Sequence, residues 1–397
     1  MSVKSNAYEL DQQYVMQTYG RLPVTFVRGE GSYLFDDNGN RYLDCLSGLA
    51  VTSLGHSNPE VAEAIANQAR TLLHTSNLYL TEHQPVVAKA LDELIGGGGR
   101  TFFANSGAEA NECAIKLARR YGQTNGGPER FHIVSAYGSF HGRTLTTLAA
   151  TGQPQKQETF QPLPAGFRQV EFCDIAALRD ALSDDRVCAV MLEPVQGEGG
   201  VNPAPAEYLQ AVRALCDERE ALLIMDEVQT GLARTGEWFG FQHSNIRPDI
   251  VTMAKALGNG MPIGACWAID RVAQAFKPGD HATTYGGQPL ATAAARCVLD
   301  IMRRESFPVR ARRASLKLTE QLSQVPQIDQ VRGLGMLLAA QLIEGIDAKA
   351  VADACMDAGL IVNAVTPTAL RFAPSLLISD EEIESAVSIL AKVLAQS

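Results

Sequence analysis

The chain has 397 residues, of which 46% are hydrophobic and 20% charged, and its formal net charge is −10. A chain of this length can bury a large core in about two compact units, and its negative charge argues against nucleic acid as a partner. No apolar stretch approaches the roughly 20 residues of a membrane helix, no hydrophobic signal segment follows Met1, and the eight cysteines form no CxxC pair, so a cytoplasmic protein with reduced thiols is expected.

Turn and cap signals organise the first part of the chain. Residues 29–40 are expected to form a hairpin with Asn38-Gly39 at its turn, because Asn-Gly favours tight hairpin turns. A helix is expected to follow, with Asn58 as its N-cap and Pro59 at the first helical position. The apolar residues expected on its buried face are Val61, Ile65 and Leu72.

Small residues open a second helix after the apolar run 100–104. Ser106, Gly107 and Ala108 would leave backbone N–H groups free to bind an anion such as a phosphate. The spacing of Ser106 and Glu109 predicts a capping box. From these residues alone, a plain helix cap is the simpler interpretation.

Two further apolar runs, 131–136 and 187–192, lead into glycine-rich loops that carry candidate functional residues. Phe140 and Arg143 lie in the first loop, and Glu198 lies in the second. An aromatic residue between glycines is often core filler, and a lone arginine is usually a surface residue. A guanidinium group can nevertheless bind a carboxylate through two parallel hydrogen bonds.

The strongest catalytic candidates follow two later apolar runs. The run 221–225 ends at Asp226, and the run 249–254 ends at Lys255. Short apolar runs of this kind indicate buried parallel strands, and ligands bind beyond the carboxyl ends of such strands. A carboxylate that keeps a pyridine nitrogen protonated, with a desolvated lysine that condenses with an aldehyde, suits the chemistry of pyridoxal phosphate.

These motifs resemble the class III (ω-amino acid) aminotransferases of pyridoxal-phosphate fold type I, from the hairpin near residue 30 to Arg371. The resemblance implies an α/β fold with a large domain, residues 56–300, whose mostly parallel sheet is flanked by helices. It also implies a smaller α+β domain built from residues 301–397 together with an N-terminal segment, residues 1–55. The matching segments are 55–59, 105–111, 137–144, 193–200, 222–231, 252–255, 284–289 and 370–374.

The same resemblance implies pyridoxal 5′-phosphate as the cofactor, with Lys255 and Asp226 as the catalytic residues. The implied cofactor-binding residues are Ser106, Gly107, Ala108, Phe140, Asp226, Val228, Gln229, Lys255 and Thr284. The residue matching Thr284 reaches the cofactor of the other subunit, so a homodimer is implied. The implied substrate-binding residues are Arg143, Glu198, Arg371 and Leu49, with Glu198 releasing Arg371 when the acceptor binds.

Within the family, the chain is most similar to enzymes that transfer the δ-amino group of N-acetylornithine to 2-oxoglutarate in arginine biosynthesis, by a ping-pong mechanism. Transaminases for succinylornithine, ornithine or 4-aminobutyrate remain alternatives. An aminomutase is less favoured because Glu198 and Arg371 serve a separate acceptor, and a non-catalytic relative would lack Lys255 or Asp226. No motif for nucleotides or metals has the required spacing, so neither a metal site nor a nucleotide site is expected.

Overall fold

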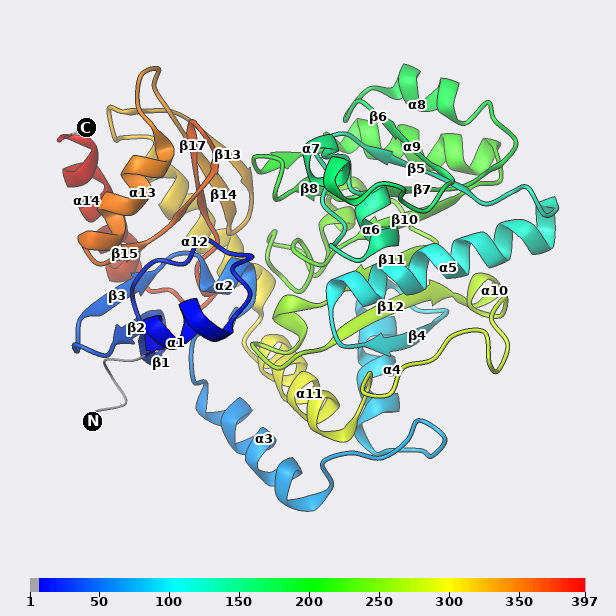
Figure 1. Ribbon diagram of the computed structural model, residues 1–397, viewed down its shortest axis with the longest axis horizontal. Helices are drawn as coiled ribbons and strands as arrows, with labels where there is room; N and C mark the ends of the chain where they lie inside the picture. The colour runs from blue at the N-terminus through cyan, green and yellow to red at the C-terminus, as the bar shows by residue number, and fades with distance from the viewer. Residues whose placement is uncertain (1–6, 397) are drawn as a thin grey trace.

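A seven-stranded sheet forms the centre of the computed structural model, which describes residues 7–396 (Figure 1). Its strand order is β4-β12-β11-β10-β7-β5-β6, and β12 alone runs antiparallel to its neighbours. The expectation of a mostly parallel sheet is therefore confirmed. Its strands are β4 (Gly99–Ala104), β5 (His132–Ala136), β6 (Phe167–Val170), β7 (Val187–Leu192), β10 (Leu222–Asp226), β11 (Ile250–Met253) and β12 (Gly264–Ile269).

Helices cover both faces of this sheet, which explains why β7, β10 and β11 are buried along their whole length. Alternate residues of a strand point to opposite faces, so Leu222 and Ile224 pack in the core under α5, while Leu223 and Met225 pack in the larger core on the other face. The surrounding helices are α3 (Pro59–Thr71), α4 (His83–Ile95), α5 (Gly107–Gly126), α6 (Leu145–Ala150), α7 (Pro154–Gln157), α8 (Ile175–Ala181), α9 (Ala206–Glu218), α10 (Asp270–Ala273) and α11 (Pro289–Arg304). Short connecting elements are the ribbon of β8 (Val195–Gln196) and β9 (Asn202–Pro203), and the 3₁₀ turns η2 (Glu158–Phe160), η3 (Gly240–Ser244) and η4 (Lys255–Leu257).

Two four-stranded sheets are built from the two ends of the chain, and one of them contains strands from both ends. One has the order β1-β2-β3-β15, with β15 parallel to β3, and the other has the order β13-β14-β17-β16. In Figure 1 the blue N-terminal strands therefore lie beside the orange and red C-terminal elements. The elements are α1 (Ala7–Tyr14), β1 (Phe26–Glu30), β2 (Tyr33–Asp36), β3 (Arg41–Asp44), α2 (Ser47–Ala50), α12 (Phe307–Leu322), β13 (Ile328–Leu334), β14 (Leu337–Leu342), α13 (Ala348–Asp357), β15 (Leu360–Ile361), β16 (Asn363–Thr366), β17 (Ala369–Phe372) and α14 (Asp380–Leu394). The domain limits at residues 55 and 300 stay a prediction.

The local signals were mostly accurate. The Asn58 side chain accepts hydrogen bonds from two N–H groups at the start of α3, and the predicted Asn38-Gly39 turn joins β2 to β3. The prediction that Leu72 lies on the buried face of this helix is wrong, because α3 ends at Thr71 and Leu72 is 45% exposed. Among residues 7–396, no helix is both long and apolar enough to cross a membrane.

Candidate active site

The carboxyl ends of several sheet strands surround a cavity of about 400 Å³. Asp226 is the last residue of β10, and Lys255 lies two residues beyond β11. Strands β4, β5 and β7 lead into the loops that supply the remaining wall. The sequence-predicted residues that line this cavity are Ser106, Gly107, Ala108, Phe140, Arg143, Glu198, Asp226, Val228, Gln229 and Lys255.

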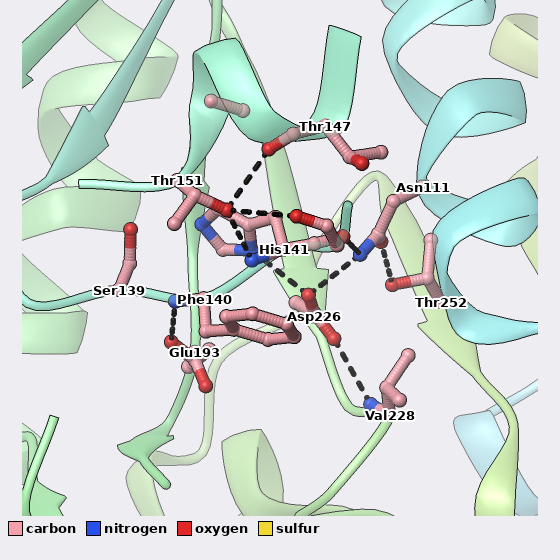
Figure 2. A network of polar contacts seen from close by, with 12 residues as sticks. Asn111, Ser139, Phe140, His141, Thr147, Thr151, Glu193, Asp226, Val228 and Thr252 are labelled. Atoms are coloured by element: carbon pink, nitrogen blue, oxygen red, sulfur yellow. Dashed lines mark hydrogen bonds and ion pairs between the residues drawn. The ribbon is translucent and has the colours of Figure 1, made fainter. Parts of the chain in front are cut away.

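A buried hydrogen-bond network holds the Asp226 carboxylate (Figure 2). Its Oδ2 accepts hydrogen bonds from Asn111 Nδ2 and His141 Nδ1, both at 2.8 Å, and its Oδ1 accepts one from the Val228 N–H at 3.0 Å. Thr252 Oγ1 donates to Asn111 Oδ1 at 2.6 Å, which orients that amide. Three donors therefore hold both oxygens of this carboxylate in a fixed orientation at the cavity wall.

Asp226 in turn changes the pKa of His141. Burial opposes protonation of this imidazole, but the hydrogen bond to Asp226 and the negative charge of Asp226 outweigh burial and raise the His141 pKa. With Nδ1 bonded to the carboxylate, Nε2 has no hydrogen-bond partner among the residues described. His141 is therefore a wall residue whose one hydrogen-bonded ring nitrogen orients Asp226.

Lys255 occupies an unusual backbone conformation directly after β11. Its φ is +41°, a region that residues other than glycine rarely adopt. Burial lowers the pKa of its ammonium group, and the charge of Arg371 adds to this effect, while Glu198 and Asp226 oppose it. A lowered pKa increases the neutral amine that a nucleophilic lysine requires.

The start of α5 forms an anion cradle beside Asp226. Ser106 Oγ accepts a hydrogen bond from the Glu109 N–H at 3.2 Å, while the N–H groups of Gly107 and Ala108 belong to the first turn and have no partner within the helix. A Cβ atom at Gly107 would lie 2.7 Å from Val228 Cγ1, so glycine is required by the close packing. The predicted capping box is only half present, because the Glu109 carboxylate accepts from the Asn105 N–H instead of from Ser106.

Glu198 and Arg371 form an ion pair at one side of the cavity. Arg371 Nη1 donates to Glu198 Oε1 at 2.5 Å and to the Gly197 carbonyl at 3.2 Å, while its Nε donates to Asn363 Oδ1 at 3.1 Å. Arg371 is 1% exposed and lies behind Glu198, outside the cavity wall. Burial would raise the pKa of Glu198, but the Arg371 charge and hydrogen bond outweigh it and lower that pKa.

Comparison with known proteins identifies the family. The family model for aminotransferase class-III matches residues 14–394. The chain is 46% identical to the acetylornithine aminotransferase of Caldanaerobacter subterraneus subsp. tengcongensis over 97% of its own length and 98% of the relative's. It is 45% identical to that of Methanocaldococcus jannaschii, over 99% of each chain. The chain belongs to the class III aminotransferase family.

Solved structures agree with this class III aminotransferase assignment. The ornithine aminotransferase of Toxoplasma gondii superposes with a TM-score of 0.95 at 33% identity, covering 100% of this chain and 96% of that one. The N-acetylornithine aminotransferase of Stenotrophomonas maltophilia superposes with a TM-score of 0.85 at 36% identity, covering 98% of each. A structure of the T. gondii enzyme has partial occupancy of PLP at its active site. Fold type I, the enzyme class and the pyridoxal-phosphate cofactor expected from the sequence are confirmed.

Three predicted site residues of the class III aminotransferase do not line this cavity, and one of them is Arg371, which lies behind Glu198. Thr284 is exposed and lines a separate surface cavity. Leu49 is 38% exposed, and Val51 lines the active-site cavity in its place. The reason is local, because positive φ angles at residues 48–50 reverse the chain there. The expected contact of Leu49 with the substrate stays a prediction.

Three further wall residues were not predicted from the sequence. Asn111 and His141 contact Asp226, and the buried Glu193 accepts hydrogen bonds from the N–H groups of Phe140 and Gly197 at 3.0 and 3.4 Å. Burial raises the Glu193 pKa to about 8; the charge of His141 opposes this rise and the charge of Asp226 adds to it. Asn111 could have been noticed as a polar residue within the apolar stripe of α5, whereas nothing near His141 in the sequence indicates its partner.

Proposed function

We propose that the chain transfers the δ-amino group of N-acetylornithine to 2-oxoglutarate, producing N-acetylglutamate 5-semialdehyde and glutamate, as in arginine biosynthesis. Relatives with the name acetylornithine aminotransferase, 45–46% identical over nearly their whole length, support this donor. The observation that carries the chemistry is the meeting of Lys255 and Asp226 in one cavity beside the Glu198–Arg371 pair.

The residues around the cavity fit pyridoxal phosphate. The cradle at Ser106, Gly107 and Ala108 would hold the phosphate, because it combines free N–H groups with the positive end of the α5 dipole. Asp226 would bind the pyridine nitrogen, and Lys255 would bind the aldehyde carbon. Phe140 and Val228 would contact the ring faces, and Gln229 would bond the phenolic oxygen. When bound, this cofactor withdraws electrons from the substrate carbon that bears the amino group.

Each side chain then has a defined task. The Lys255 amine would act as general base on the proton of the substrate carbon and, as general acid, would donate that proton to the former aldehyde carbon of the bound cofactor. Asp226, held in place by Asn111 and His141, would face the pyridine nitrogen throughout the reaction. Arg143 binds the carboxylate of the substrate, and Glu198 covers Arg371 until the acceptor's carboxylate replaces it.

The donor preference follows from the apolar side of the cavity wall. Val51 can neither donate nor accept a side-chain hydrogen bond, so a free α-ammonium group beside it would lose water without gaining a partner, at a cost of about 1–3 kcal/mol. An acetylated nitrogen is uncharged and brings a methyl group that an apolar wall accepts. N-Acetylornithine should therefore exceed ornithine by at least about tenfold in kcat/KM.

A panel of amine donors tests this assignment. The purified enzyme is assayed with N-acetylornithine, N-succinylornithine, ornithine and 4-aminobutyrate at saturating 2-oxoglutarate, with Lys255→Ala as the inactive control. The highest kcat/KM with N-acetylornithine supports the proposal. A higher value with any other donor of the panel contradicts it.

A homodimer and a cytoplasmic location complete the proposal. Leu78 and Leu80 are 87% and 99% exposed and line the same surface cavity as Thr284. Clustered apolar side chains of this kind mark protein–protein interfaces, so a second copy is proposed to cover them and receive Thr284 at its phosphate. All eight cysteine thiols are free, and six are buried, which is in keeping with a reducing compartment.

A further inference from the structure

Lys156 adds a second positive charge beside Arg143. The Lys156 Nζ atom lies 5.3 Å from the centroid of the Phe140 ring, and the Arg143 Cζ atom lies 5.5 Å from the same centroid. Phe140 and Arg143 both line the active-site cavity. The two cations therefore share one aromatic ring of the cavity wall.

The local structure holds Lys156 in this position. It lies on the single-turn helix α7, and its ammonium group donates a hydrogen bond to the Gln153 side chain. Gln153 Nε2 in turn donates to the Ser139 carbonyl at 3.1 Å, one residue before Phe140. The lysine is thus tied to the same loop that presents Phe140 and Arg143.

Neither cation is neutralised within residues 7–396. Arg143 and Lys156 form no ion pair there, and the hydrogen-bond acceptor of Lys156 is a neutral amide. Arg371, by contrast, is paired with Glu198. Burial lowers the pKa of Lys156, the charge of Arg143 adds to that decrease and Glu198 opposes it, so the lysine lies within electrostatic reach of both wall residues.

An anion between the two cations would relieve their repulsion. In the proposed function, the donor and the acceptor each have a carboxylate that binds Arg143. A single carboxylate has enough lone pairs to accept hydrogen bonds from a guanidinium group and an ammonium group at the same time. We propose that Lys156 is a substrate-binding residue that binds the same substrate carboxylate as Arg143 in both half-reactions. This inference rests on the proposed function.

Glutarate, a dicarboxylate that has no oxo group to react, tests the inference directly. Its dissociation constant is measured by calorimetry on the holoenzyme and on Lys156→Gln, Lys156→Arg and Lys89→Gln. Lys89 is the charge-matched control, since its side chain is 79% exposed on α4 and paired with Glu93. Lys156→Gln should weaken glutarate binding about tenfold, Lys156→Arg should restore most of it, and Lys89→Gln should leave it unchanged.

Steady-state kinetics separate binding from a structural role. Lys156→Gln should raise KM for both N-acetylornithine and 2-oxoglutarate about tenfold while kcat changes by less than about twofold. Unchanged glutarate binding in Lys156→Gln, or a loss confined to kcat that Lys156→Arg does not restore, would overturn the inference. Glutarate binding does not depend on which amine is the donor. A wrong donor assignment can therefore be distinguished from a wrong role for Lys156.

Discussion

Replacing Glu198 with glutamine removes the carboxylate that pairs with the buried Arg371. Arg371 keeps its hydrogen bonds to the Gly197 carbonyl and to Asn363 Oδ1, so the position of the guanidinium should be preserved. The variant removes only the negative charge that pairs with the Arg371 guanidinium. Under the proposed function an incoming carboxylate displaces Glu198 in the wild-type enzyme, whereas in the variant Arg371 carries no carboxylate to be displaced.

The size of the effect follows from the geometry. Two unit charges about 4 Å apart at an effective dielectric of about 20 attract by about 4 kcal/mol. The Glu198 side chain is 29% exposed, so solvent screening and desolvation reduce the net value. A charged hydrogen bond of about 1.5–3 kcal/mol remains, equivalent to about 10- to 150-fold in a rate or binding ratio. Because the proposed function places a carboxylate of the acceptor, and hence of glutamate, on Arg371, glutamate should gain over N-acetylornithine by about tenfold or more in kcat/KM.

The assay compares kcat/KM for glutamate and for N-acetylornithine as amine donors in the wild type, in Glu198→Gln and in Glu237→Gln. Glu237 is the control, because it pairs with Arg312 at 2.8 Å on the surface. A glutamate to N-acetylornithine ratio that is the same in Glu198→Gln as in the wild type would refute the idea that this pair controls access to Arg371.

Three more perturbations have defined outcomes. In Gly107→Ala the new Cβ would lie 2.7 Å from Val228 Cγ1, which should lower the free energy of unfolding by about 1–3 kcal/mol and weaken the retention of pyridoxal phosphate, measured by absorbance after dialysis. The control Gly20→Ala places no atom within 4 Å of its Cβ and should retain the cofactor as the wild type does. Burial raises the pKa of Glu227 to about 7. Between about pH 4.5 and 7 the folded state therefore holds a proton that the unfolded state has released, so the free energy of unfolding should fall by on the order of 1–3 kcal/mol as the pH rises through this range. Glu227→Gln should flatten that slope in denaturant titrations, and an identical slope would contradict the explanation. Leu80→Asp should shift the enzyme to monomers in sedimentation velocity, and a dimer of unchanged stability would count against the proposed interface.

The sequence by itself determined the elements whose signals are local. The apolar runs before Asp226 and Lys255 became the buried strands β10 and β11, since continuous apolar residues between polar turns suit a strand covered on both faces. The cap at Asn58 formed as predicted, because a cap depends on contacts within three residues. The resemblance to class III aminotransferases supplied the candidate residues of the active site, and most of them line one cavity.

Only the tertiary structure decided which side chains meet. Asn111 and His141 lie 115 and 85 residues away from Asp226, and they reach it because α5 packs on the sheet and the loop after β5 crosses the end of β10. Lys156 carries no motif of its own and joins Arg143 only through the fold of α7. Periodicity along a chain shows which side chains are buried, but the order of strands in the sheet determines their partners. That order comes from the packing of the whole core rather than from any single segment.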